Sequence, residues 1–381
     1  MLIIVRIAGI ICQLILTVFI YKVEGSQSLV LYGFLAGVLN FTQLSDLGIS
    51  YICRQKGGYL SRTVLWLLLG WILIISILTT AVIVCLVEYA EAFVPDLLLF
   101  TVVVTGGVMF IQSIYFNRYK DVWIYCINPI GALVSVFVGL TTGMSAIPVY
   151  FATIFLCWLA LMLNEMFRDS LPGDAMDLRA LWSEMKTYSI PSSANRLSSM
   201  STTSLVQMLL PLSGDPAFVA SYLLLVRPAQ AFRTLYIAIV QRYWTNMNVG
   251  TSGFPIKISA RLTIDSARML NVASCGLLVL CLGFWWVICN EFLGLESEAH
   301  HWIILVILCV YIALILTEIR ITRALIEGYV SLQAQAGVLS LIVSMVLFKL
   351  LSGHNVQGWF VLLIPLINRG LKVCVTLFNN K

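Results

Sequence analysis

The chain has 381 residues, of which 60% are hydrophobic and 11% are charged, with a net charge of +5 and a mean hydropathy of +0.96. Soluble globular domains carry about 25% charged residues, so this composition excludes a soluble protein and indicates a polytopic membrane protein. The basic excess does not require nucleic acid as a partner, because the basic residues are distributed among the loops as membrane topology demands.

Apolar runs long enough to cross a membrane recur along the whole chain. Each span needs ~20 residues, so about twelve spans leave no room for a separate soluble domain. The run that starts at Leu2 has no small-residue cleavage site after it, which favours an uncleaved first helix over a secretory signal. We expect spans near residues 2–21, 29–52, 62–87, 96–117, 121–141 and 145–166, and then near 189–212, 217–241, 268–290, 301–325, 329–351 and 355–378.

The charges of the connecting segments alternate in sign along this series of spans. Cytoplasmic loops of membrane proteins are enriched in Lys and Arg, so the alternation predicts about twelve spans with both termini in the cytoplasm. The predicted outer loops contain Lys22, Lys349, Glu88, Glu91, Asp96, Asp215, Glu291, Glu296 and Glu298. The predicted inner segments contain Arg54, Lys56, Arg62, Arg118, Lys120, Arg168, Arg179, Lys186, Arg242, Lys257, Arg261, Arg268 and, in the tail, Lys372 and Lys381.

The longest polar stretch, residues 164–191, separates six predicted spans from six more. It divides the chain into an amino-terminal half (1–171), a cytoplasmic linker (172–188) and a carboxyl-terminal half (189–381). In the linker, Asp174 is placed to cap a helix. Apolar side chains recur at helical spacing behind it, which predicts a short amphipathic helix on the membrane surface; a partly ordered loop is the alternative. These side chains are Leu178, Leu181, Trp182, Met185 and Tyr188.

The ten cysteines and three histidines form no ligand pattern that we recognise. Nine of the cysteines lie inside apolar runs, no CxxC spacing occurs, and the adjacent His300 and His301 do not make a ligand set. We therefore expect no metal site, no disulfide framework and no cofactor.

Charged residues inside the predicted spans are the main functional signal. An ionisable group at the centre of a bilayer costs ~2.5–3.5 kcal/mol on insertion scales, and such groups face a cavity or a partner. The second span aligns Gln43, Asp46, Ser50 and Arg54 on one helical face. The seventh aligns Ser192, Arg196, Ser199 and Thr203, with Gln207 close by. The eighth carries Arg227, Gln230 and Arg233, and the tenth carries Glu318, Arg320 and Arg323.

Each of these charges also has a structural interpretation. Arg320 and Arg323 lie near the inner end of their span and can extend to lipid headgroups, while Arg54 also fits a topology charge. Arg196 and Arg227 can form ion pairs between helices, for which Asp46 is the natural partner. If they instead line a chamber, its basic groups outnumber its acids. Guanidinium groups bind phosphate in a bidentate manner, so such a chamber suits an anionic substrate.

One proline in this set has a predictable local effect. Pro228 lacks a backbone N–H, so it leaves a carbonyl one turn earlier in the helix without its usual donor. Helices at membrane depth often bend at such a position. The sequence therefore predicts a kink in the eighth span beside Arg227.

In these features the chain resembles the O-antigen (Wzx-type) polysaccharide flippases, whose superfamily also contains the multidrug and toxin extrusion (MATE) transporters. The family has an Asp-Leu-Gly motif ending the second helix and a basic residue soon after, matched here by Asp46, Leu47, Gly48 and Arg54 in LSDLGISYICRQ. The stretches SIPSSANRLSS and SGDPAFVASYLLLVRPAQAF are similar in layout to the start of the family's second half. Family members often have an acid beside the basic residue early in the seventh span, where this chain has Asn195 before Arg196.

The resemblance implies an all-α, MATE-like fold with two six-helix halves around a central cavity. It also implies a transporter rather than an enzyme. That transporter moves undecaprenyl-pyrophosphate-linked oligosaccharide units across the bacterial inner membrane by alternating access, within lipopolysaccharide or related polysaccharide biosynthesis. A proton or sodium ion is the expected coupling ion, and other polysaccharide-assembly membrane proteins are expected partners. The basic residues Arg54, Arg196, Arg227, Arg233, Arg320 and Arg323 would hold the pyrophosphate, while Gln43, Ser199, Thr203, Gln230 and the coupling candidate Asp46 supply polar groups.

Two other functions compete with this one. A drug or cation antiporter of the same superfamily needs a cavity dominated by carboxylates, and this chain has few acids inside its spans. A polysaccharide polymerase or ligase usually carries a large external loop, whereas the external loops predicted here are short.

Overall fold

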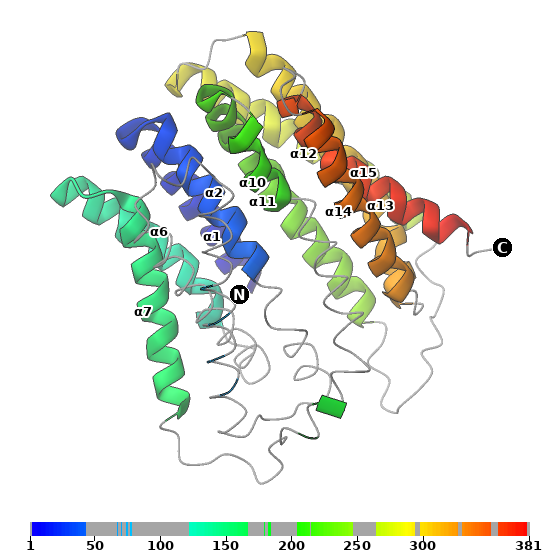
Figure 1. The fold of residues 1–381 in the computed structure, drawn as a ribbon, viewed down its shortest axis with the longest axis horizontal. Helices are drawn as coiled ribbons and strands as arrows, with labels where there is room; N and C mark the ends of the chain where they lie inside the picture. Colours follow the sequence, from blue (N-terminus) through cyan, green and yellow to red (C-terminus); the bar gives the residue numbers. More distant parts are fainter. Residues whose placement is uncertain are drawn as a thin grey trace. The chain divides into compact units, whose positions relative to one another are not determined.

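The computed structural model describes residues 2–42, 122–166, 204–213, 215–246, 264–293, 298–326, 330–351 and 357–378, together with positions 67, 70, 74, 77, 179, 182 and 183. Within these residues every regular element is a helix (Figure 1). Four helices there are long and apolar enough to cross a membrane, over Ile7–Glu24, Arg268–Leu293, His301–Ile321 and Gln357–Val375. The expected class, an all-α membrane protein, is confirmed at this level.

The chain divides into two compact units, Met1–Pro216 (unit 1) and Ala217–Lys381 (unit 2). The helix of the predicted seventh span thus belongs to unit 1. In the predicted linker, Arg179, Trp182 and Ser183 are helical and exposed. Whether that helix lies on the membrane surface stays a prediction.

Unit 1 contains five α-helices and one short π-helix among its described residues. They are α1 (Leu2–Phe19), η1 (Ile20–Glu24), α2 (Ser26–Thr42), α6 (Val122–Thr142), α7 (Ala146–Met166) and α10 (Ser204–Ser213). The turn after η1 needs Gly25, whose φ of 92° lies in the region that side chains disfavour. Its N–H donates to the carbonyl of Ile20 and so ends the helix.

The helices of unit 1 pack through close backbone approaches. Helix α1 packs on α6, α6 on α7, and α2 on α10. At the α2–α10 contact, a Cβ on Gly37 would lie 3.0 Å from Met208 and 3.1 Å from the carbonyl of Ser204. A side chain at position 37 would therefore force the neighbouring atoms of α10 to shift. The buried side chains around these contacts include Leu16, Ile20, Leu29, Leu35, Ile147, Phe151, Trp158 and Leu210.

Two hydrogen bonds join the end of η1 in unit 1 to the start of α7. The Glu24 carboxylate accepts hydrogen bonds from the Ser145 hydroxyl (2.8 Å) and from the backbone N–H of Ala146 (2.6 Å). A carboxylate at this position satisfies an N–H that has no partner within the helix, and it interacts favourably with the helix dipole. Glu24 thus acts as a helix cap supplied from another part of the chain.

A second polar link lies between α1, α2 and α7. The Gln13 side chain donates to the Tyr150 hydroxyl (2.7 Å) and accepts from the Tyr32 hydroxyl (2.8 Å). Tyr32 and Tyr150 also pack edge to face, with ring centroids 5.8 Å apart. Both polar ends of the Gln13 amide are thereby used inside the unit.

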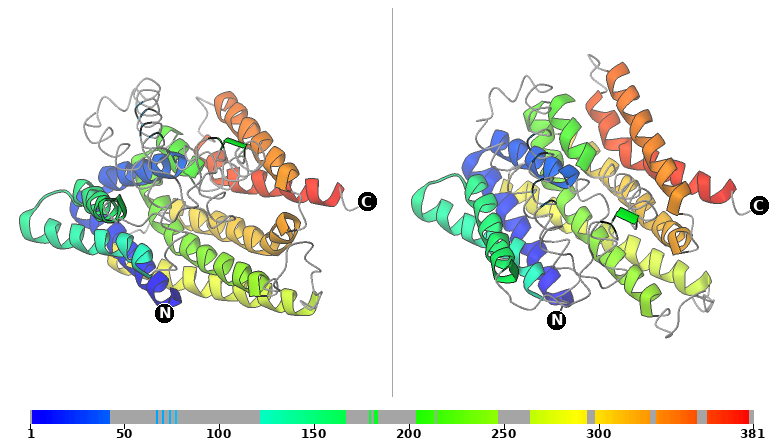
Figure 2. Two further views of the ribbon diagram at one scale, coloured as in Figure 1. Left: turned by 90° about the horizontal axis from the view of Figure 1, so that it is seen from below. Right: turned by 60° about the horizontal axis from the view of Figure 1, so that its bottom comes forward.

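Among its described residues, unit 2 contains five long helices, which Figures 1 and 2 show from several sides. Helix α13 packs on α12 and α15, and α14 lies beside α15. The helices are α11 (Pro216–Asn246), α12 (Ile264–Leu293), α13 (Glu298–Ile326), α14 (Val330–Leu350) and α15 (Gln357–Phe378).

The outer face of α12 is apolar and exposed, while its opposite face is buried. Buried positions include Leu278, Leu282, Trp285 and Cys289. Exposed positions include Met269, Val272, Leu280, Phe284 and Phe292. Contiguous apolar surface of this extent is rare on soluble monomers and indicates contact with lipid.

Aromatic pairs mark one end of unit 2. Phe218 at the start of α11 packs on Trp359 at the start of α15, and Trp286 near the end of α12 packs on His301 near the start of α13. Tryptophan is enriched where a membrane meets water, so this end fits a membrane boundary.

The proline in α11 leaves a carbonyl without its helical donor, as the sequence predicts, while the kink expected beside Arg227 stays a prediction. Pro228 lies inside the helix, so the carbonyl four residues earlier, that of Leu224, has no helical donor. The indole N–H of Trp285 on α12 donates to this carbonyl at 3.1 Å. A side chain of a neighbouring helix therefore replaces the hydrogen bond that the proline removes.

Candidate functional site

The charged face of α11 lies within unit 2. Arg227, Gln230 and Arg233 follow one another at intervals of three residues, and all three side chains are partly buried. The Gln230 side chain shares a hydrogen bond with Tyr311 of α13. Arg227 interacts electrostatically with Tyr311 and with Tyr222 of its own helix. This face of α11 is thus turned toward polar groups of α13.

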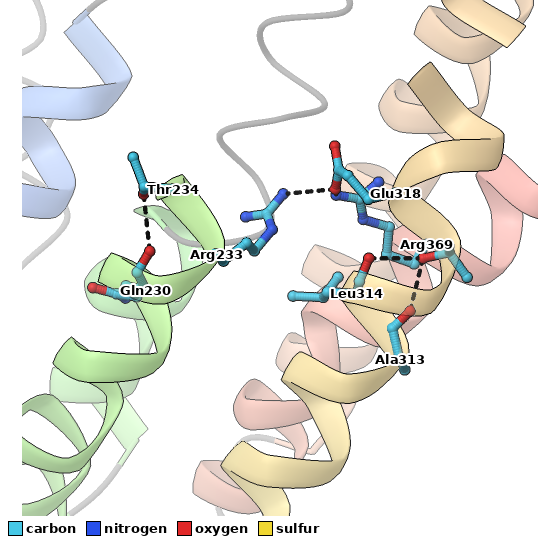
Figure 3. A network of polar contacts seen from close by, with 8 residues as sticks. Gln230, Arg233, Thr234, Ala313, Leu314, Glu318 and Arg369 are labelled. Carbon is cyan, nitrogen blue, oxygen red and sulfur yellow. Dashed lines mark hydrogen bonds and ion pairs between the residues drawn. The ribbon is translucent and has the colours of Figure 1, made fainter. Parts of the chain in front are cut away.

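Glu318 of α13 is the centre of the charges that the structure brings together (Figure 3). Arg233 Nη2 lies 3.7 Å from Glu318 Oε2. Arg369 of α15 donates through its own Nη2 to the same oxygen. The side chains are only 13%, 10% and 6% exposed for Arg233, Glu318 and Arg369. One buried carboxylate oxygen therefore joins three helices.

A fourth ionisable side chain lies close to this group. Lys372 follows Arg369 by about one helical turn and is buried. It interacts electrostatically with Arg369, Glu318 and Arg233. We call these four residues the Glu318 cluster. Its two guanidinium groups alone exceed the carboxylate by one positive charge.

Polar groups of neighbouring helices extend the surroundings of the cluster. Tyr236 of α11 donates from its hydroxyl to Asn271 of α12 at 2.5 Å, and it also interacts electrostatically with Glu318. Gln333 of α14 donates to the carbonyl of Lys372 at 3.4 Å. Helices α11 to α15 thus each contribute a polar group to this region.

The predicted site residues fall into three groups. Arg227, Gln230 and Arg233 lie on one helix and approach α13, as described above. Arg320 is exposed on α13; it lies about 200° around the helix from Glu318, so the structure does not bring it into the cluster. Arg323 lies in α13, but its side chain is outside the described part. Arg54, Arg196, Asp46, Gln43, Ser199 and Thr203 lie outside the described residues, and their roles stay predictions.

Two residues of the cluster were missed by the sequence analysis. Arg369 was overlooked, and Lys372 was counted with the cytoplasmic tail. The assignment of Lys372 is corrected, because its side chain is buried in α15. The available signal was the run of Asn368, Arg369 and Lys372 inside the last apolar segment. A spacing of three or four residues places such groups on one helical face.

Comparison with known proteins identifies no relative. No protein-family model, curated protein or solved structure matches the chain. The chemistry of the site is therefore inferred from its own side chains.

The arrangement is suited to holding an anion. Guanidinium groups stay charged when buried and offer several N–H donors in a plane. Within the described residues, no group of His, Cys, Asp or Glu side chains is arranged to hold a metal ion. The cluster instead offers cationic donors from α11 and α15 around one carboxylate of α13.

Proposed function

We propose that this chain is a flippase for undecaprenyl-pyrophosphate-linked oligosaccharides, the repeat units of O-antigen or a related surface polysaccharide. It moves them from the cytoplasmic to the periplasmic leaflet of the bacterial inner membrane. The resemblance of the second, seventh and eighth spans supports this function, as does the helical membrane fold. The observation that carries it is the excess of buried guanidinium groups around Glu318.

The position of the cluster along its helices agrees with this function. Glu318 lies three residues before the end of the span His301–Ile321, and Arg369 lies six residues before the end of Gln357–Val375. At 1.5 Å per residue, these distances are about 5 and 9 Å. In the topology that loop charge predicts, both ends are cytoplasmic. A lipid-linked pyrophosphate is loaded from that side, with its lipid tail left in the bilayer.

The finer architecture belongs to the proposal as well. Loop charge and the resemblance support twelve helices in two six-helix halves around a cavity, with both termini cytoplasmic. Alternating access is the mechanism that such transporters use. A proton or sodium gradient supplies the driving force, since one charge moving through 100 mV is worth ~2.3 kcal/mol. Asp46 is the coupling candidate from the sequence.

The test is complementation of a strain from which the gene has been deleted. The deletion strain should accumulate lipid-linked single repeat units on the cytoplasmic side. Arg233→Gln and Arg369→Gln should fail to restore surface polysaccharide even when their expression is adjusted to the wild-type protein level. The control Arg268→Gln changes an exposed arginine of α12 and should restore it fully.

Other outcomes would point to other functions. Repeat units that are flipped but left unpolymerised would indicate a polymerase. Normal polysaccharide combined with increased sensitivity to cationic drugs would favour an antiporter, for which the buried carboxylate of Glu318 is the natural cation ligand.

A further inference from the structure

Most N–H donors of Arg233 and Arg369 form no hydrogen bond with the Glu318 carboxylate. Arg233 and Arg369 each approach it through one nitrogen, Nη2, and both approach the same oxygen, Oε2. In each arginine the buried Nε has no hydrogen-bond partner among the described residues. A guanidinium group carries five N–H donors and favours bidentate pairing with an oxyanion. Here that pairing is not formed with the carboxylate.

We infer that Glu318 is an internal counter-ion, which occupies the place of a diphosphate group in the ligand-free protein and is displaced when that group binds to Arg233 and Arg369. This inference rests on the proposed function and adds to it a regulatory residue at the same site. The ligand class is a diphosphate, either as the headgroup of a lipid-linked sugar or as a free anion.

The physical reason for a counter-ion is the cost of burying charge without a partner. Two guanidinium groups facing each other across α11 and α15 would repel and would lack solvation, so the ligand-free protein needs an anion between them. A carboxylate from α13 supplies it. A diphosphate offers more oxygen atoms and more negative charge than one carboxylate, so it can form the bidentate contacts that Glu318 leaves unmade. A monovalent anion gains little from the exchange.

The displaced carboxylate has a cation to which it can move. Lys372 already interacts electrostatically with Glu318 and lies one turn beyond Arg369. Pairing with Lys372 keeps Glu318 from being left buried and alone while the ligand is bound. Glu318 competes with the bound ligand for the arginines, and this competition accelerates release. The Glu318 carboxylate therefore determines both the affinity for the diphosphate and the rate at which the diphosphate dissociates.

The experiment measures binding of inorganic pyrophosphate to the purified full-length protein in nanodiscs, by titration calorimetry. If Glu318 competes with the ligand, Glu318→Gln should bind pyrophosphate about tenfold or more tightly than the wild type, a change of about 1.4 kcal/mol. Arg369→Gln should abolish binding. Glu291→Gln, an exposed position on α12, is the matched control and should bind as the wild type does.

A second variant decides the question if Glu318→Gln does not fold. Glu318→Asp keeps the charge but withdraws it by one methylene, so it should bind pyrophosphate more tightly than the wild type. If the folded variants at position 318 bind pyrophosphate as tightly as the wild type or more weakly, Glu318 is not a counter-ion that the ligand displaces. This conclusion would hold even if Arg369→Gln loses binding and the anion site is thereby supported. Absence of pyrophosphate binding in the wild type and in every variant would overturn both this inference and the diphosphate substrate.

Two further ligands distinguish the source of the anion. Tighter binding of a diphosphate lipid than of pyrophosphate would identify a headgroup site, and equal binding would identify a site for the free anion. Both results support the exchange. Equal binding of a zwitterionic phospholipid would contradict the diphosphate class.

Discussion

Arg369 of α15 donates to Glu318 of α13, so a buried ion pair joins the last described helix to a position 51 residues earlier in the chain. The same carboxylate oxygen is approached by Arg233 of α11. Removal of one member of a buried pair leaves the other charge without compensation, and this penalty is larger than the net stabilisation by the intact pair. The pair is therefore a sensitive point for both stability and ligand binding.

The first prediction concerns stability at this pair. Arg369→Ala should lower the free energy of unfolding by about 3–5 kcal/mol, since Glu318 stays buried with a weaker partner. The double variant Glu318→Gln, Arg369→Gln should recover only part of that loss, because Arg233 then lacks its carboxylate partner. Denaturant unfolding in detergent measures both. An Arg369→Ala protein as stable as the control Arg268→Ala would show that the pair does not stabilise the fold.

The second prediction concerns the carbonyl of Leu224. Trp285→Phe removes its donor and should lower the free energy of unfolding by about 1–3 kcal/mol, because a buried acceptor is left without a partner. In a Pro228→Ala background the residue at 228 regains its N–H, so the same change should cost less. A double-mutant cycle measures the coupling and cancels the smaller volume of phenylalanine. If Trp285→Phe lowers the free energy of unfolding equally with proline and with alanine at position 228, the indole hydrogen bond does not compensate for the proline.

The third prediction concerns the cap on α7. Glu24→Ala should destabilise the protein by about 1 kcal/mol, since the first N–H of α7 loses its acceptor. Glu24→Gln keeps one acceptor oxygen and should lose less. Hydrogen exchange of the Ala146 amide gives a local measurement and should become faster in the alanine variant. Unchanged exchange there would show that Glu24 does not protect the helix start.

The fourth prediction tests Arg196 and Arg227, which the sequence analysis places in a basic cavity. Arg196→Ala or Arg227→Ala should abolish surface polysaccharide while the protein level in the membrane is kept. Lysine at either position should restore activity only in part, because a point charge loses the bidentate fork. If these residues are structural, alanine should lower protein abundance, and neutralising the partner, as in Asp46→Asn, should restore it. Full activity with alanine at both positions would refute the basic cavity.

The fifth prediction concerns the linker helix. Trp182 is helical and 60% exposed, which fits a side chain that enters the membrane interface. Leu181→Asp combined with Trp182→Asp should release the helix from the lipid. A spin label at position 185 should then change from lipid-accessible to water-accessible. Equal water access in both proteins would favour the loop alternative.

Most helix positions could be predicted because they depend on local properties of the chain. Predicted spans 121–141, 145–166 and 329–351 agree within one residue with α6, α7 and α14. A membrane span requires a long apolar run, and the breaks between runs fall at residues such as Gly25 and Gly143, both with positive φ. Local rules also identified Pro228 as the residue that frees a carbonyl.

The candidate site was less predictable because its contacts join distant parts of the chain. Spacing places Gln230 and Arg233 near one face of α11, but it cannot reveal that Glu318 lies opposite. The donor to Leu224 likewise comes from Trp285, 61 residues further on. Arg369 was overlooked within an apolar run, although its charge there was itself the signal. Pairing of Asp46 with Arg196 or Arg227 lies outside the described residues and stays a prediction.

The proline of α11 has a mechanical consequence for recognition. Arg227 comes directly before Pro228, and Arg233 comes five residues after it. The Leu224 carbonyl is bonded to α12 rather than to its own helix, so the two parts of α11 lack the backbone hydrogen bond that would join them across the proline. A change in the angle between these two parts would therefore alter the separation of the two guanidinium groups. The spacing of the two arginines of α11 thus depends on the helix geometry at Pro228.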